Sequence, residues 1–228
     1  MNPGERGNRG RAEGTLIAAL WGATAAFCLL LVAVAWPEYW RYVAPEMSPL
    51  AWWESVLLAF SAFTCLLLAW DAWVREERRT VRAGWLAVAA GFAFLALDER
   101  FAVHERVRDR FLKPTGIRLF PWAEAGDWLI PLYALAGLAA AWGIWRLLGV
   151  RPGARRFFAA ALVLAACSVA LDTVDIRSLD ATAERFLQSV EEILESLAMT
   201  AFLSGFLLAL TSRLGRIPDA EQGNRRPE

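Results

Sequence analysis

The sequence contains few of the residues that build most metal and redox centres. It has a single histidine, His104, and three cysteines that form no Cys-x-x-Cys pair. A zinc site rich in histidine and a dithiol redox motif are therefore not expected. The formal net charge is zero, because 24 basic residues balance 24 acidic ones. With no excess of positive charge, the composition indicates no nucleic-acid partner.

Hydrophobic residues, in contrast, make up 57% of the 228 residues, and the charged residues are segregated from them. Long apolar runs alternate with short charged clusters, which is typical of a membrane protein rather than of a soluble domain. The chain also has twelve tryptophans, many of them near the ends of the apolar runs. Tryptophan at such positions favours the interface between lipid tails and headgroups.

Six segments are long enough to cross a hydrocarbon core of about 30 Å as α-helices. They are residues 15–36, 50–73, 84–103, 127–148, 156–171 and 190–210. The sequence therefore predicts an all-α, polytopic transmembrane helix bundle of about six spans. Near the end of the first run, Ala33-Val34-Ala35 resembles a signal-peptide cleavage site. The apolar run is longer than a usual signal-peptide core of roughly 7–15 residues, so we expect a retained anchor.

Basic residues near the ends of the spans predict the orientation of the bundle. Fifteen arginines lie in the two tails and in the second-to-third and fourth-to-fifth loops, against nine basic residues on the other side. The side richer in basic residues is usually cytoplasmic. Both termini are therefore predicted to be cytoplasmic, in a multi-pass protein of the inner (plasma) membrane. The bundle should occupy residues 15–212, and the polar tails at 1–14 and 213–228 are predicted to be disordered.

Acidic residues from five of these spans fall near the non-cytoplasmic side. They are Glu54, Asp98, Glu99, Glu105, Asp127, Asp172, Asp175, Glu191, Glu192 and Glu195. A carboxylate at the depth of the lipid tails costs roughly 2.5–3.5 kcal/mol on insertion scales, so such groups face the bundle interior and need a partner. The spacing of seven residues between Asp98 and Glu105 places both on one helix face, as does the spacing of four between Glu191 and Glu195. We therefore expect these carboxylates to converge.

Three kinds of partner can neutralise such a cluster. The first is a bound cation, and the second is an ion pair with Arg100, Arg106 or Arg108, which lie close by in the sequence. The third is protonation, which burial favours. For a cation, carboxylates with one imidazole suit Mn, Fe, Mg, Ca or Zn by ligand type.

The cation hypothesis assigns a role to each residue. The expected ligands of a divalent metal ion are Asp98, Glu105, Glu191 and Glu195. Glu54 or Asp172 would act as a general base. His104 would be a ligand or a proton carrier, although on a regular helix it is rotated away from the stripe that carries Asp98.

The segment that joins the third and fourth predicted spans, residues 108–128, mixes basic and bulky apolar side chains. This composition predicts a stretch that lies on the membrane surface. Its arginines and its lysine can hold lipid phosphates beside the acidic cluster, or they can serve only to anchor the chain among headgroups.

Two short motifs resemble sequences of known families. The stretch FLALDERFAVHERV, residues 94–107, resembles a Leu-Asp-Glu…His-Glu signature of uncharacterised bacterial multi-pass membrane proteins, and VEEILESLAM, residues 190–199, is similar to an acidic helix that follows it there. More distantly, Glu54 with Ser61, and Glu191 with Glu195, resemble motifs of the alkaline ceramidase-like membrane hydrolases. That resemblance implies a metal-dependent hydrolase, although a chain with one histidine cannot supply the three histidines of their metal site.

These observations support three hypotheses. The first is a metal-dependent hydrolase of a lipid or lipid-like substrate at the outer face, with membrane lipids as its partners. The second is a cation or proton transporter whose vestibule is the acidic cluster. The third is a non-catalytic membrane subunit or sensor whose acids are satisfied internally or by another protein.

Overall fold

The computed structural model describes residues 3–45, 47–118, 129–172 and 180–214. The described residues are almost entirely helical and contain no strand, which confirms the predicted all-α fold. The long helices are α1 (Pro3–Val34), α3 (Pro49–Val74), α4 (Arg79–Phe101), α6 (Leu129–Leu148), α7 (Pro152–Asp172) and α8 (Ala181–Leu214). The short ones are α2 (Trp40–Val43), α5 (Val103–Val107), a π-helical turn η1 (Arg108–Leu112) and a 3₁₀ turn η2 (Lys113–Thr115).

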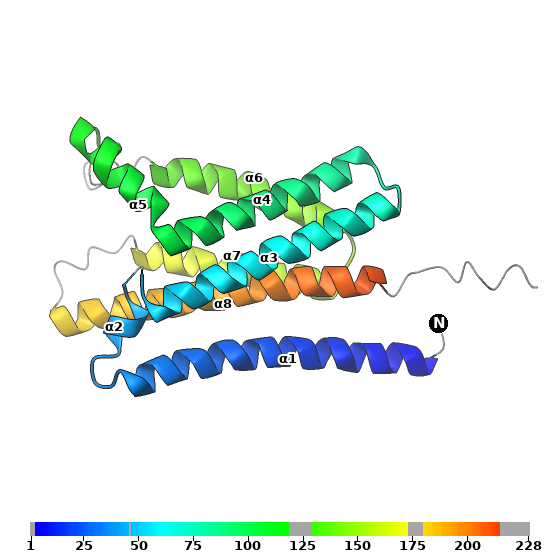
Figure 1. Ribbon diagram of the computed structural model, residues 1–228, viewed down its shortest axis with the longest axis horizontal. Helices are drawn as coiled ribbons and strands as arrows, with labels where there is room; N and C mark the ends of the chain where they lie inside the picture. The colour runs from blue at the N-terminus through cyan, green and yellow to red at the C-terminus, as the bar shows by residue number, and fades with distance from the viewer. Residues whose placement is uncertain (1–2, 46, 119–128, 173–179, 215–228) are drawn as a thin grey trace, which may run out of the picture.

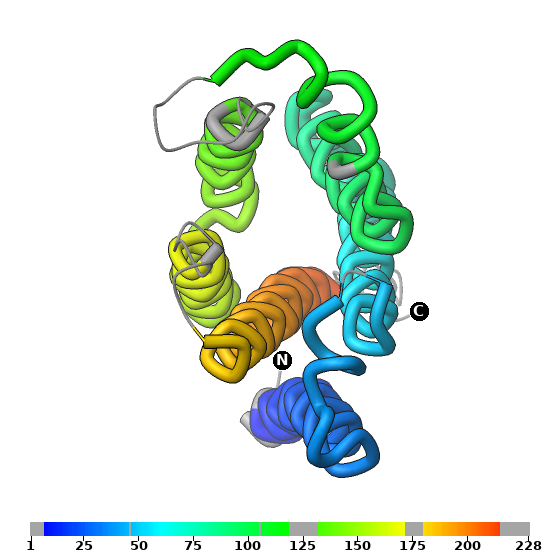
Figure 2. The backbone as a smooth tube through the Cα atoms, turned by 90° about the vertical axis from the view of Figure 1, so that its left-hand side faces the viewer, coloured from blue at the N-terminus to red at the C-terminus, as the bar shows by residue number. Residues whose placement is uncertain are grey.

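The long helices lie roughly parallel or antiparallel to one another, along the long axis of the molecule (Figure 1). Viewed down the bundle, α3, α4, α6, α7 and α8 follow one another around a ring, and α1 lies outside it against α8 (Figure 2). The beginning of α1 and the end of α8 lie at the same end of the bundle (Figure 1). We call this the terminal end, and the end where α3 and α8 begin the site end.

Five helices of the described chain are long and apolar enough to cross a membrane. They are Gly7–Val34, Pro49–Val74, Arg79–Phe101, Pro152–Leu171 and Ala181–Leu214. Helix α6 corresponds to the fourth predicted span, and its stretch Leu132–Leu148 is a shorter apolar helix. This set of helices indicates an integral membrane protein.

Two helices extend beyond the apolar runs that predicted them. Helix α1 begins at Pro3 and so includes residues that composition predicts to be disordered; there, Arg9 and Glu13 form an i,i+4 ion pair of 3.1 Å. Helix α8 begins at Ala181, well before residue 190, where the sequence places its start. Its first turn is capped by Asp180, whose Oδ1 accepts hydrogen bonds from the backbone N–H groups of Thr182 and Ala183. The C-terminal tail from residue 215 lies outside the described residues.

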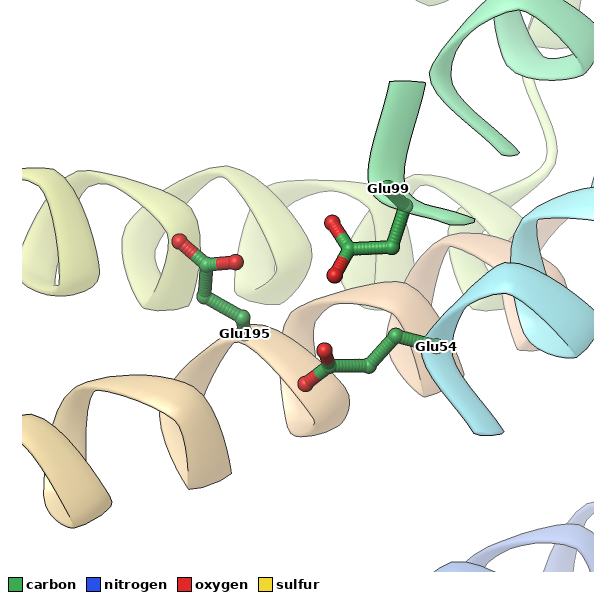
Figure 3. Close-up of side chains that lie close together, drawn as sticks. All are labelled: Glu54, Glu99 and Glu195. Atoms are coloured by element: carbon green, nitrogen blue, oxygen red, sulfur yellow. The ribbon is translucent and has the colours of Figure 1, made fainter. Parts of the chain in front are cut away.

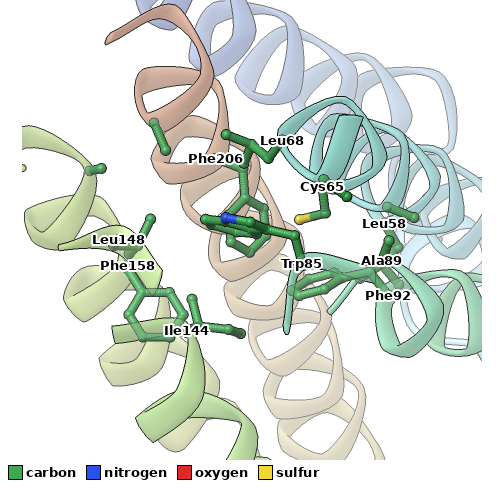
Figure 4. Close-up of a cluster of buried hydrophobic side chains, with 14 residues drawn as sticks. Leu58, Cys65, Leu68, Trp85, Ala89, Phe92, Ile144, Leu148, Phe158 and Phe206 are labelled. Atoms are coloured by element: carbon green, nitrogen blue, oxygen red, sulfur yellow. The ribbon is translucent and has the colours of Figure 1, made fainter. Parts of the chain in front are cut away.

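A hydrophobic core lies within the ring of helices (Figure 4), and we call it the aromatic core after its buried rings Trp85, Phe92, Phe158 and Phe206. Trp85 and Phe92 of α4 both pack edge-on against Phe206 of α8, with ring centroids 6.2 and 5.1 Å apart. Helices α7 and α8 approach closely at Gly205, where a Cβ atom would lie 3.1 Å from the carbonyl oxygen of Ala154. Small residues at helix crossings permit such close packing within membranes.

Hydroxyl groups join α1 to the ring. Thr24 of α1 and Thr200 of α8 are fully buried, and their Oγ1 atoms are 2.9 Å apart. Trp21 Nε1 donates a hydrogen bond to Ser204 Oγ, and Trp53 Nε1 donates one to Thr24 Oγ1. Such bonds between membrane helices contribute about 0.6 kcal/mol each on average.

A group of charged residues fastens α3 to α8 at the terminal end. Arg213 of α8 is 7% exposed, and its Nη1 lies 3.0 Å from a carboxylate oxygen of Asp71 and 3.0 Å from one of Glu77. Arg75 pairs with Asp71 at 2.8 Å and donates a hydrogen bond to the carbonyl oxygen of Arg213. The buried arginine of α8 therefore pairs with Asp71 of α3 and with Glu77 of the connection between α3 and α4.

Candidate metal centre

Three glutamates from three helices meet at the site end of the bundle. Glu54 of α3, Glu99 of α4 and Glu195 of α8 turn their carboxylates toward one another (Figure 3). One oxygen from each can be chosen so that all three lie within 4.8 Å of one another. Glu54 is 0% exposed, while Glu99 and Glu195 are partly buried. We call these three residues the glutamate triad.

The hairpin of α3 and α4 places two members of the triad at the same depth. Glu54 precedes the last residue of α3, Val74, by twenty residues, and Glu99 follows the first residue of α4, Arg79, by twenty. Residues at equal distances from the connection of an antiparallel helix pair lie level with each other. The start of α3 is fixed by Ser48, whose Oγ accepts hydrogen bonds from the N–H groups of Leu50 and Ala51.

Two buried serines hold two of the carboxylates. Ser196 Oγ donates a hydrogen bond of 2.6 Å to Glu54 Oε1, and Ser168 Oγ of α7 donates one of 2.8 Å to Glu195 Oε1. The serines are 0% and 1% exposed. The second oxygen of Glu54, Oε2, is buried and has no hydrogen-bond partner among the described residues. A buried, unpaired carboxylate oxygen beside two further carboxylates requires a positively charged ligand or a proton.

Electrostatic repulsion makes this requirement strong. If all three carboxylates are ionised, two charges 4.8 Å apart repel each other by about 3.5 kcal/mol at an effective dielectric constant of 20, and the triad contains three such pairs. A divalent cation bound among the three carboxylates would replace this repulsion with attraction. Three carboxylates supply the oxygen ligands that hard cations prefer. Since no histidine or cysteine belongs to the triad, its chemistry suits Mg, Mn, Ca or Fe better than Zn.

An aspartate–histidine pair lies next to the triad in the sequence. Asp98 precedes Glu99, and it accepts hydrogen bonds from the backbone N–H of His104 at 2.7 Å and at its other oxygen from the ring, where Nδ1 lies 3.1 Å away. A regular helix would keep His104 away from Asp98. The chain instead leaves the helix at Ala102, whose φ of +46° is in the left-handed region, and turns back toward Asp98. The His104 ring also lies edge-on to Tyr133 of α6.

The structure brings together some of the residues selected from the sequence. Glu54 and Glu195 belong to the triad, while Asp98 and His104 form the neighbouring pair. Glu191 lies one turn before Glu195 on α8, is partly buried and is outside the group of three. The side chains of Glu105 and Asp172 lie outside the described part of the chain. The roles assigned to these residues remain predictions.

The triad includes Glu99, a member of the predicted acidic cluster to which helical spacing assigns no role as a ligand. Helical spacing linked Asp98 to Glu105, and Glu99 is rotated by about 100° from that stripe. The signal that identifies Glu99 is its position in the hairpin, level with Glu54. A buried glutamate on one arm of a hairpin makes an acidic residue at the matching position on the other arm a candidate partner.

Comparison with known protein families identifies one family that the chain matches. A family described as a domain of unknown function (DUF8692) matches residues 41–210, about three quarters of the sequence. The chain belongs to this family. The DUF8692 region contains the whole triad, both serines and the Asp98–His104 pair, whereas α1 precedes it. No curated protein and no solved structure matches the chain.

Proposed function

We propose that this protein is a membrane-embedded, metal-dependent hydrolase of a lipid or lipid-like substrate. The supporting observation is the triad, in which the carboxylate of the fully buried Glu54 lies beside two other carboxylates and has one oxygen with no hydrogen-bond partner among the described residues. Glu54, Glu99 and Glu195 would hold one divalent cation. Of the four ligands that helical spacing suggests, this set keeps Glu195. It has Glu54 and Glu99 in place of Asp98, Glu105 and Glu191.

The neighbouring residues fit a hydrolytic reaction. A divalent cation lowers the pKa of a coordinated water and polarises the carbonyl or phosphoryl group of the substrate. His104, held by Asp98 through Nδ1, would take the proton of that water and return it to the leaving group. One water is consumed: its hydroxide joins the carbonyl carbon or phosphorus, and its proton joins the departing oxygen or nitrogen.

The proposed topology places the site near lipid headgroups. We propose six crossings, with α6 as the sixth membrane helix and both termini in the cytoplasm of a cell whose inner membrane holds the protein. The common position of the start of α1 and the end of α8 (Figure 1) supports an even number of crossings. Glu99 is two residues from the end of α4, a depth at which the ester or amide region of a lipid is within reach.

The aromatic core favours an enzyme over a transporter. Between the triad and the terminal end, buried side chains such as Phe92, Phe158 and Phe206 fill the ring of helices. A conducted ion would need a polar route through them. Ion flux measured in proteoliposomes without any substrate would support transport and contradict the hydrolase.

Metal analysis of the detergent-purified protein tests the site directly. We expect stoichiometric divalent metal in the wild type and its loss in Glu54→Gln and Glu99→Gln. Glutamine keeps the side-chain volume and, at position 54, an oxygen that accepts from Ser196. Asp98→Asn and Glu191→Gln should retain the metal, and the exposed Glu38→Gln is the matched control.

Two results would contradict the proposal. One is a wild type with no metal above background, also after incubation with Mg²⁺ or Mn²⁺. The other is a Glu99→Gln protein that retains its metal while Asp98→Asn loses it, which would support the ligands that helical spacing suggests. Charge-neutralising variants that only reduce assembly or stability, with no hydrolysis by the wild type, would support the non-catalytic subunit instead.

A further inference from the structure

Beyond α4 the chain forms a short arm, residues 103–118, at the site end. It consists of α5, η1, η2 and the three residues 116–118 that follow, and it projects past the end of α4 (Figure 1). Its basic side chains are Arg106, Arg108, Arg110, Lys113 and Arg118. The arm is joined to the triad through α4, since Glu99 precedes its first residue by four positions.

Only some of these positive charges are used within the protein. Asp109 pairs with Lys113 at 2.8 Å and with Arg108 at 3.4 Å, and the hydrogen bond from Lys113 lowers the pKa of the Asp109 carboxyl. Arg106, Arg110 and Arg118 are exposed, and no carboxylate among the described residues pairs with them. Each of these three guanidinium groups is therefore exposed to the surroundings without a carboxylate partner among the described residues.

Apolar side chains are exposed along the same arm. Phe111 is 63% exposed and Ile117 is 59% exposed, and the guanidinium of Arg110 lies 5.9 Å from the centre of the Phe111 ring. Apolar side chains beside unpaired cations are typical of a segment at headgroup depth, where rings enter the lipid and cations remain at the surface. A guanidinium group binds the oxygens of a phosphate more specifically than a point charge does.

We propose that the arm is a binding surface for the phosphate groups of anionic phospholipids in the leaflet at the site end. Arg106, Arg110 and Arg118 supply the charge, and Phe111 and Ile117 hold the arm among the acyl chains. Anionic phospholipids are then the lipid class delivered to the triad, a final step that rests on the proposed function.

Hydrogen exchange of the arm in nanodiscs tests the surface. We expect residues 106–118 to exchange several-fold more slowly in nanodiscs of phosphatidylcholine mixed with phosphatidylglycerol than in phosphatidylcholine alone. The difference should shrink at high salt, because exposed charges are screened. The variant R106Q/R110Q/R118Q should abolish it, and the matched control R106K/R110K/R118K should keep most of it.

Two outcomes would overturn the proposal. Equal exchange in both kinds of nanodisc would show that the arm is anchored among headgroups without recognising their charge. Equal protection by inorganic phosphate in phosphatidylcholine nanodiscs would show that the lipid is not the source of the phosphate.

Metal analysis of the same preparations separates this inference from the proposed function. The arm variants should keep the metal content of the wild type, because none of the substituted residues belongs to the triad. Lipid-dependent protection in a wild type that binds no metal would leave the lipid surface in place and remove only the substrate assignment.

Discussion

Ser168 and Ser196 each donate a hydrogen bond to one oxygen of a triad carboxylate. Residues that orient metal ligands in this way typically contribute 10–100-fold to metal affinity. We expect Ser196→Ala to weaken Mn²⁺ binding about 10-fold, measured by electron paramagnetic resonance of free Mn²⁺, and Ser196→Thr to restore it. Ser55→Ala is the control, because among the described residues the Ser55 hydroxyl of α3 donates to the carbonyl oxygen of Ala51 and not to a triad carboxylate.

A lower melting temperature with unchanged Mn²⁺ affinity in Ser196→Ala would contradict this role. Ser196 would then contribute only to the packing of α3 against α8. The comparison with Thr is decisive, since Thr keeps the hydroxyl group and adds only a methyl group.

The site was partly predictable at the scale of single residues. Glu54 and Glu195 could be selected because a carboxylate at membrane depth must face the interior of the bundle. Choosing between Asp98 and Glu99 required the rotation of α4, which its packing against α3 determines. The contact between His104 and Asp98 could not be predicted, because it depends on a left-handed conformation at Ala102 and nothing marks an alanine for that conformation.

Among the helices, the pair α7 and α8 depends on one glycine. A Cβ atom on Gly205 would lie 3.1 Å from the carbonyl oxygen of Ala154. We expect Gly205→Val to separate the helices and destabilise the protein by about 1–3 kcal/mol, measured as unfolding in mixed detergent. Gly91→Val is the matched control, since nothing lies within 4 Å of the position of its Cβ. Equal stability of the two variants would contradict the close packing.

The N-terminus of α8 should respond to acid. Hydrogen bonds from the N–H groups of Ala183 and Thr182 lower the pKa of Asp180. Because its pKa is lower in the folded protein than in the unfolded chain, Asp180 stabilises the first turn above the ordinary aspartate pKa of about 3.9 and loses this effect as the pH falls further. Amide exchange at residues 182–184, corrected for intrinsic rates, should therefore accelerate below about pH 4. Asp180→Asn should show no such pH dependence.

Helix ends were less predictable than helix positions. The apolar runs locate the long helices, but α8 begins at Ala181 because Asp180 caps a polar first turn that hydropathy does not detect. Similarly, α7 begins at Pro152, a residue suited to the first position of a helix. Capping depends on single polar side chains, whereas spans are predicted from averages over many residues.

For the molecule as a whole, the buried ion pairs of Arg213 and the candidate site are located at opposite ends of the bundle. Arg213→Ala would leave Asp71 and Glu77 without their shared partner at the terminal end. We expect the free energy of unfolding to fall by about 3 kcal/mol. The metal content of the folded fraction should not change, because the triad lies at the site end. Arg78→Gln is the control, since Arg78 is exposed. A fall in metal content together with full stability would show that the two ends are coupled.

The equal arms of the α3–α4 hairpin have a consequence for chain length. One extra residue in either helix alone would carry its glutamate about 1.5 Å along the axis and about 100° around it, out of reach of the opposite carboxylate. The same extension made in both helices would keep Glu54 and Glu99 level and change only how far they stand from the connecting turn. The equal lengths of the two arms thus determine the depth of the pair, and matched insertions would move Glu54 and Glu99 together along the bilayer normal.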